Sequence, residues 1–183
     1  MRLLGATLFA AAIAGAAYVH QTTPTWYARI VYPLEYEQIV EGHARNYDLD
    51  PALLAAVIYQ ESKFDADAQS QSGAIGLMQL MPQTARGIAL RTGGHRFRLD
   101  DLYNPEINVR YGSWYLRHLL DKYGNVDDAL AAYNGGQGNV DRGIRYPETL
   151  EYVDHVLELR DVYRRAYGSE LRALGATPAA APR

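Results

Sequence analysis

Residues 51–62 read PALLAAVIYQES, and every position from Ala52 to Tyr59 in this stretch is apolar or aromatic. A helix that is apolar on all sides is buried inside a domain rather than laid on its surface. Asp50 followed by Pro51 marks the start of the helix, since aspartate is a good N-cap and proline fits the first helical position. The stretch therefore predicts a central helix through the middle of a domain.

Apolar residues recur at helical spacing on both sides of this stretch, from about residue 34 to residue 167, and no alternating run of useful length indicates a strand. Gly124 and Gly135 stand where left-handed helix C-caps are expected. The sequence therefore predicts an all-α domain. Its helices are expected at residues 34–47, 51–62, 82–91, 105–123, 127–134 and 148–167.

The two ends of the chain differ in composition from this domain. Residues 3–19 are almost entirely apolar, follow Arg2 and contain small residues typical of a cleavage site, which is the pattern of an export signal or a membrane anchor. A buried N-terminal helix is the alternative, and the polar stretch at residues 21–25 argues against it. We therefore expect an exported chain with a signal peptide or anchor at residues 1–20, a linker at 21–33 and a disordered tail at 168–183.

Charge and cysteine content exclude several functions. The chain has 18 Lys and Arg against 21 Asp and Glu, a net charge of -3, and no dense basic run, which argues against nucleic-acid binding. With no cysteine, disulfides, thiolate metal sites and cysteine nucleophiles are excluded. The histidines form no pair at the spacing of a zinc protease, and no acidic ladder resembles a calcium loop. No metal and no cofactor is therefore expected.

Glu61 is the candidate catalytic residue of the central helix. It follows Leu54 and Ile58 at helical spacing, which puts its carboxylate on the same face as core side chains. Partial burial and the carbonyl end of the helix both disfavour the charged form, so we expect the pKa of Glu61 to rise. A carboxyl group that stays protonated near neutral pH can protonate the leaving oxygen of a glycosidic bond. A solvent-facing glutamate at a helix end is the alternative.

Residues 73–82, GAIGLMQLMP, are too rich in glycine for a helix and too apolar for an exposed loop. This composition suggests a backbone segment that closely approaches a neighbouring group. Together with Glu61-Ser62 and with the stretch AYNG at residues 132–135, this segment resembles the catalytic domain of the soluble lytic transglycosylases, a lysozyme-like helical family. The resemblance covers about residues 34–160. It implies a lysozyme-like helical fold with a substrate cleft, and a catalytic domain at residues 34–167.

The resemblance also implies roles for individual residues, with Glu61 as the catalytic acid and base. The residues implied in substrate binding are Ser70 and Gln79 as hydrogen-bond partners of the sugar, Met78 and Met81 in the groove, Tyr133 near the reacting sugar or Glu61, Asn134 as support of the turn, and Glu148 on the far side of the substrate. A purely structural role, such as turn capping or core packing, is the alternative for each of them. The sequence departs from the usual family pattern at Asp65-Ala66, where many members have Asn-Pro, and at Leu150, where arginine is common.

The reaction implied by the resemblance is cleavage of the MurNAc-GlcNAc β-1,4 bond of peptidoglycan glycan strands without water, which leaves 1,6-anhydro-MurNAc ends. A goose-type lysozyme-like hydrolase of the same bond is one alternative, and it needs Asp65, Asp67, Asp100 or Asp101 across the cleft. A non-catalytic peptidoglycan-binding module is another. The expected location is the periplasm, the cell envelope or the extracellular space, with a membrane tether through residues 3–19 if that segment is retained.

Overall fold

The structure, a computed structural model, describes residues 24–175, which fall into two compact units that divide after Pro33. The described part of the first unit contains α2 (Thr25–Val31), a helix that lies within the segment expected to be a linker. The expected signal peptide or anchor at residues 1–20 lies outside the described residues. Between residues 24 and 175, no helix has the length and apolar character needed to span a membrane.

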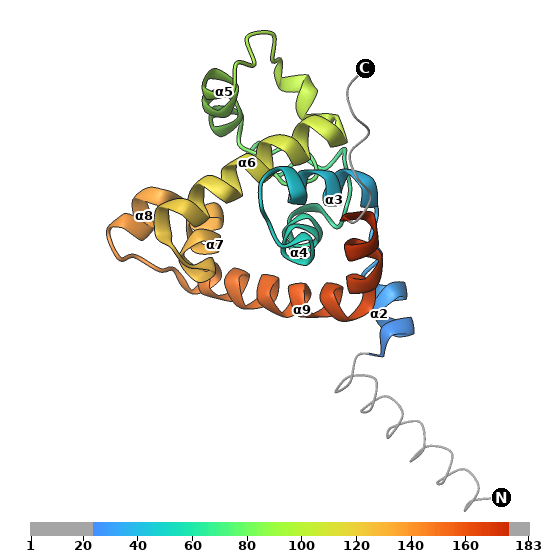
Figure 1. The fold of residues 1–183 in the computed structure, drawn as a ribbon. Helices are drawn as coiled ribbons and strands as arrows, with labels where there is room; N and C mark the ends of the chain where they lie inside the picture. Colours follow the sequence, from blue (N-terminus) through green and yellow to red (C-terminus); the bar gives the residue numbers. More distant parts are fainter. Residues whose placement is uncertain (1–23, 176–183) are drawn as a thin grey trace, which may run out of the picture. The chain divides into compact units, whose positions relative to one another are not determined.

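The second unit, from Leu34 onward, is helical, and its described residues contain no strand (Figure 1). The prediction of an all-α domain is confirmed. In chain order the elements are α3 (Glu37–Asn46), α4 (Pro51–Ser62), α5 (Pro82–Arg91), the 3-10 helix η1 (Leu99–Tyr103), α6 (Pro105–Tyr123), α7 (Val126–Gly135), α8 (Gln137–Asp141) and α9 (Pro147–Gly175).

Helix α4 is the central helix of this unit. Its first turn is capped by Asp50, whose Oδ1 accepts a hydrogen bond from the backbone N–H of Ala52 at 2.9 Å. The side chains of residues 52–58 are all 3% exposed or less. Helix α4 packs against α3 and, most extensively, against α9, which is the longest helix of the described chain (Figure 1). The predicted buried central helix is confirmed with its bounds.

Two boundaries of the predicted helices differ from the structure by more than one residue. Helix α3 begins at Glu37 rather than at residue 34, because Tyr36 has a left-handed backbone (φ 52°) that helical geometry does not allow. Helix α9 continues to Gly175 rather than ending at 167, because buried residues such as Leu171, 3% exposed, extend its apolar face. The expectation of a disordered tail is therefore wrong for residues 168–175, and residues 176–183 lie outside the described part.

The segment between α4 and α5 turns back beside the C-terminal end of α4. The turn begins at Lys63 and Phe64, which are both left-handed, with φ of 54° and 66°. The buried Phe64 side chain holds this geometry by packing edge-on against Tyr163 of α9, at 6.3 Å between ring centroids. The hydroxyl of Ser62 then donates a hydrogen bond to the carbonyl oxygen of Leu77 at 2.8 Å. The loop that contains residues 73–81 is thereby fixed next to Glu61.

Candidate active site

Glu61 lies in the last turn of α4 with a partly exposed side chain. Its Oε1 accepts a hydrogen bond from the hydroxyl of Tyr152, on α9, at 2.6 Å. Burial raises the pKa of Glu61 from its ordinary value of 4.5 to about 7, against the hydrogen bond from Tyr152, which stabilises the carboxylate and lowers the pKa. The predicted rise in pKa is confirmed, with burial as its main cause. At neutral pH both protonation states of Glu61 are populated.

Tyr133, in the last turns of α7, is the third member of the site. Its hydroxyl donates a hydrogen bond to the carbonyl oxygen of Met78 at 2.8 Å. Burial and the negative charge of Glu61 raise the pKa values of Tyr133 and Tyr152 well above 10, so both phenols keep their protons. Three helices that are distant in sequence thus supply a carboxyl group and two tyrosines, which we call the carboxyl-tyrosine cluster (Glu61, Tyr133, Tyr152).

Asn108, a fully buried residue of α6, holds the loop that faces this cluster. Its side-chain amide donates hydrogen bonds to the carbonyl oxygens of Ile75 at 2.9 Å and Leu102 at 2.8 Å, and its Oδ1 accepts one from the backbone N–H of Met78 at 2.8 Å. Gly76 has φ of +76°, and a Cβ there would overlap the Asn108 amide. Asn108 therefore fixes the backbone N–H of Met78, the residue whose carbonyl oxygen accepts the hydrogen bond from the hydroxyl of Tyr133.

Ser70 and Gln79, the expected hydrogen-bond partners of the sugar, both bond to the loop itself. The hydroxyl of Ser70 accepts a hydrogen bond from the backbone N–H of Ala74 at 2.9 Å. The amide of Gln79 donates to the carbonyl oxygens of Ala68 at 3.1 Å and Gly76 at 2.9 Å, from a left-handed backbone with φ of 46°. Their structural roles are thus visible, and their contacts with a sugar stay predictions.

The two methionines expected in the groove differ in position. Met78 is fully buried, and its side chain occupies the space that a Cβ on Gly112 of α6 would need. The expectation of a groove contact is therefore wrong for this side chain, because the close approach of α6 draws it into the core. Met81 is 43% exposed and remains available for contact.

Asn134 and Glu148, the remaining residues predicted to meet substrate, are both exposed. Asn134 follows Tyr133 in α7, and Glu148 lies in the first turn of α9, one helical turn before Tyr152. Sequence reasoning singled out Glu148 and missed Tyr152. The four-residue spacing of the two on one helix was the available signal.

The aspartates that a hydrolase would need are engaged elsewhere or lie in solvent. Asp65 accepts a hydrogen bond from the backbone N–H of Asp67 at 2.9 Å within an exposed turn. Asp101 accepts one from the backbone N–H of Arg98 at 2.8 Å, and the exposed Asp100 lies 3.9 Å from the Arg98 guanidinium. Among the described residues, no carboxylate contributes to the pKa shift of Glu61.

Comparison with known proteins identifies the family. The family model "Transglycosylase SLT domain" matches residues 38–156. A transglycosylase of Enterobacteria phage PRD1 is 36% identical over 125 residues, which are 68% of this chain and 43% of the phage protein. The soluble lytic murein transglycosylase of Salmonella typhimurium is 31% identical over 157 residues, 76% of this chain and 24% of its own length.

Solved structures agree with the sequence comparison. An inactive glutamate-to-glutamine mutant of the lytic transglycosylase Slt from Pseudomonas aeruginosa superimposes with a TM-score of 0.73 at 30% identity, over 82% of this chain and 27% of that one. The lysozyme-like helical fold implied by the sequence is thereby confirmed. The chain spans less than half the length of each of these relatives. This chain belongs to the transglycosylase SLT domain family.

Proposed function

We propose that this chain is an exported peptidoglycan lytic transglycosylase that cleaves the MurNAc-GlcNAc β-1,4 bond without water. The observation that carries the proposal is the state of Glu61: a carboxyl group with a pKa of about 7, held by Tyr152 at 2.6 Å beside a glycine-flanked loop. The relatives named as murein transglycosylases support the substrate. The inactive glutamate-to-glutamine mutant of the Pseudomonas relative supports an essential glutamate in this family.

In the first step, protonated Glu61 donates its proton to the glycosidic oxygen while the bond from that oxygen to the anomeric carbon breaks. General acids work best when their pKa lies near the working pH, which a pKa of about 7 satisfies. The hydroxyl of Tyr152 stabilises the carboxylate that forms as the proton leaves. Because Tyr152 keeps its own proton, it acts only as a hydrogen-bond donor in this step.

In the second step, the ionised Glu61 takes the proton of the MurNAc 6-hydroxyl, whose oxygen attacks the anomeric carbon. A 1,6-anhydro ring forms, and Glu61 regains its proton. Two-carboxylate glycosidases place a second carboxylate about 5 to 9.5 Å from the acid. The aspartates that a hydrolase would need either accept hydrogen bonds from neighbouring backbone N–H groups or are exposed, which supports the internal hydroxyl as nucleophile. The N-acetyl group of the sugar would stabilise the positive charge in between.

The surroundings of Glu61 suggest how the glycan is bound. We place the sugar chain against the loop of residues 73–81, where Gln79 and the exposed Met81 lie, with Ser70 at the base of the same loop. Asn134 and Glu148 are exposed on α7 and α9, the helices that carry the two tyrosines. Export and a membrane tether through residues 3–19 would bring this site to the cell wall.

Mass spectrometry of the products released from purified peptidoglycan tests the proposal. The wild type should release muropeptides that are one water lighter than the hydrolytic products, and Glu61→Gln should release none. Glu158→Gln, which changes an exposed glutamate of α9, is the matched control and should keep full activity. Hydrated products would instead identify a lysozyme-like hydrolase. Binding without any product from the wild type would identify a glycan-binding module.

A further inference from the structure

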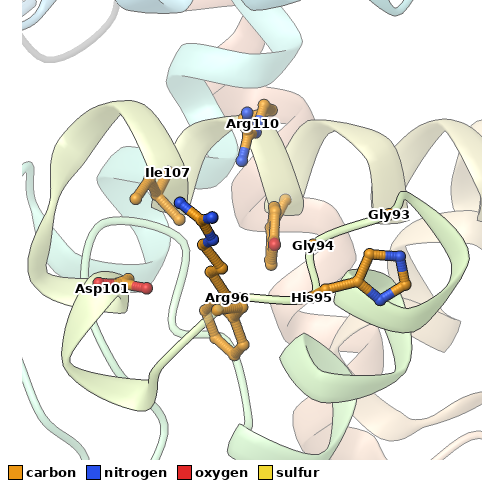
Figure 2. A pocket seen from close by; sticks show the side chains of 9 residues that line it. Gly93, Gly94, His95, Arg96, Asp101, Ile107 and Arg110 are labelled. Atoms are coloured by element: carbon orange, nitrogen blue, oxygen red, sulfur yellow. The ribbon is translucent and has the colours of Figure 1, made fainter.

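A cavity of about 400 Å³ lies between the segment of residues 93–97 and helix α6, with Asp101 of η1 at its edge (Figure 2). No member of the carboxyl-tyrosine cluster lines it. Its volume falls within the range of small-ligand pockets, about 300 to 1,000 Å³. The proposed reaction leaves this cavity without a role.

Two arginines give the cavity its charge. Figure 2 shows Arg96 extended toward the part of α6 that carries Arg110, so that both guanidinium groups lie at one end of the cavity. Neither forms an ion pair with a carboxylate in the part of the chain that the structure describes. Asp101, the one acidic residue in the lining, already accepts a hydrogen bond from the backbone of Arg98. Like charges that converge without a counter-charge favour an anionic ligand.

Aromatic side chains form another part of the cavity lining, and they are closely fitted. The rings of Phe97 and Tyr111 lie 5.2 Å apart, and the Arg110 guanidinium carbon lies 5.3 Å from the centre of the Tyr111 ring. A Cβ on Gly94 would come within 2.6 Å of the Tyr111 hydroxyl, so only glycine lets this segment pass so close to α6. Tyr111 is buried in one cluster with Leu80, which anchors the wall to the loop beside Glu61.

We propose that this cavity, the arginine pocket (Arg96, Phe97, Arg110 and Tyr111), binds a free carboxylate of the peptides attached to the glycan strand. A guanidinium group matches a carboxylate with two parallel hydrogen bonds, and the aromatic wall suits the apolar part of an amino acid. The inference rests on the proposed function, because the peptides of peptidoglycan carry such carboxylates. Nucleic acid fits poorly, since its recognition requires a long basic track and the chain has a net charge of -3.

Turnover of two matched substrates tests the arginine pocket: glycan strands that carry their peptides, and the same strands after an amidase has removed them. The readout is the ratio of kcat/KM for the first substrate to kcat/KM for the second. Arg96→Gln and Arg110→Gln should each lower this ratio about tenfold, the size expected for one hydrogen-bonded ion pair. Arg91→Gln, which removes an exposed charge of α5 outside the pocket, should leave it at the wild-type value.

Direct binding provides the second measurement. In calorimetry, a peptidoglycan tripeptide with free carboxylates should bind the wild type, and its affinity for Arg96→Gln should be lower by about tenfold or more. The amidated tripeptide should bind the wild type and Arg96→Gln equally, with the weak affinity that the free tripeptide has for Arg96→Gln. An unchanged ratio in both arginine variants, an equal loss on both substrates, or binding of acetate alone as tight as the peptide would overturn the proposal. If the wild-type protein is inactive on both substrates, the proposed function is contradicted. The calorimetric binding of the tripeptide would then still test whether the arginine pocket binds a carboxylate.

Discussion

At the scale of single residues, the pKa of Glu61 is set by burial away from water and by one neighbouring side chain. Burial raises its pKa, and the hydroxyl of Tyr152 limits that rise by stabilising the charged form. Together the two effects leave the pKa of Glu61 close to neutral pH, so the carboxyl group can both donate and accept a proton. Tyr133 does not bond to Glu61. Its hydroxyl is committed to the carbonyl oxygen of Met78, which ties α7 to the loop.

Tyr152→Phe should shift the pH dependence of the reaction. Loss of the hydrogen bond removes the one influence from the described residues that lowers the pKa of Glu61, so the pKa rises above about 7. Activity that depends on protonated Glu61 is lost as the pH rises through this pKa, and that loss should move to higher pH. We also expect kcat to fall about tenfold, because a hydrogen bond to a charged group is lost.

The measurement for Tyr152→Phe is a profile of kcat against pH, with Tyr146→Phe as the control. Tyr146 is 46% exposed and precedes α9, so its hydroxyl should not affect Glu61. A profile of Tyr152→Phe that keeps the wild-type midpoint, or that moves to lower pH, would contradict the assigned role.

Asn108→Ala should destabilise the fold more than an ordinary helix-cap substitution. It leaves the backbone N–H of Met78 and the carbonyl oxygen of Leu102 without the partner that Asn108 supplies, and it removes one of the two hydrogen bonds to the carbonyl oxygen of Ile75, which keeps the bond from the backbone N–H of Leu80. We expect a loss of about 3 kcal/mol in the free energy of unfolding, since each buried unpaired group costs about 1 to 3 kcal/mol and relaxation recovers part of it.

Urea unfolding measures this loss, and Asn104→Ala provides the comparison. Asn104 caps the same helix through a single bond to the backbone N–H of Ile107 at 3.2 Å, so its removal should cost about 1 kcal/mol. Equal losses in the two variants would show that the three hydrogen bonds of Asn108 contribute no more to stability than the single cap bond of Asn104.

At the scale of elements, glycine positions distinguish tight packing from open helix surface. Gly112 of α6 lies against the Met78 side chain, with no room for a Cβ, whereas a Cβ on Gly42 of α3 would meet nothing within 4 Å. Gly112→Ala should therefore destabilise the protein by about 1 to 3 kcal/mol through overpacking. Gly42→Ala should stabilise it by up to about 1 kcal/mol through helix propensity.

Thermal unfolding of the two alanine variants tests this contrast, and activity provides a second readout. Gly112→Ala displaces Met78, whose carbonyl oxygen holds Tyr133, so kcat should fall as well. Gly42→Ala should keep wild-type kcat. We expect the melting temperature to fall in Gly112→Ala and to rise in Gly42→Ala. A change in the same direction in both variants would rule out the packing argument.

The elements that could be predicted from sequence are those whose signals are local. The Asp50-Pro51 start of α4 and its run of apolar residues gave the helix its correct bounds. The loop between α4 and α5 could not be predicted in the same way, because its shape depends on Asn108, 30 or more residues away in sequence, and on left-handed backbone at Lys63 and Phe64. No local preference of lysine or phenylalanine indicates that geometry.

At the scale of the whole molecule, the site exists only when distant parts of the chain are assembled. Tyr152 is 91 residues from Glu61 in sequence, and the packing of α9 against α4 brings the two together. Family resemblance identified Glu61 and Tyr133. It did not identify Tyr152 as the partner of Glu61, because the four-residue spacing from Glu148 places Tyr152 on the same helix face but does not predict a hydrogen bond to a distant helix.

The same assembly makes the stability of the protein depend on pH through Glu61. The folded state holds a proton on Glu61 up to about pH 7, whereas an unfolded glutamate releases it near 4.5. Between these values the folded state binds more protons than the unfolded state, so this group lowers the stability as the pH rises. Above both pKa values the cost reaches about 3 kcal/mol.

Glu61→Gln should remove this cost, since a neutral amide can keep the hydrogen bond from Tyr152. In urea unfolding the variant should be more stable than the wild type by about 2 to 3 kcal/mol near pH 8, and the difference should close at pH values below about 4.5. Glu158→Gln, on the exposed surface of α9, should show no such pH-dependent difference. A gain that is the same at both ends of the pH range would mean that amide packing, rather than the burial of a charge, separates the variant from the wild type. A gain confined to neutral and alkaline pH would show that the fold gives up stability to keep a carboxyl group buried, as is expected of a catalytic group.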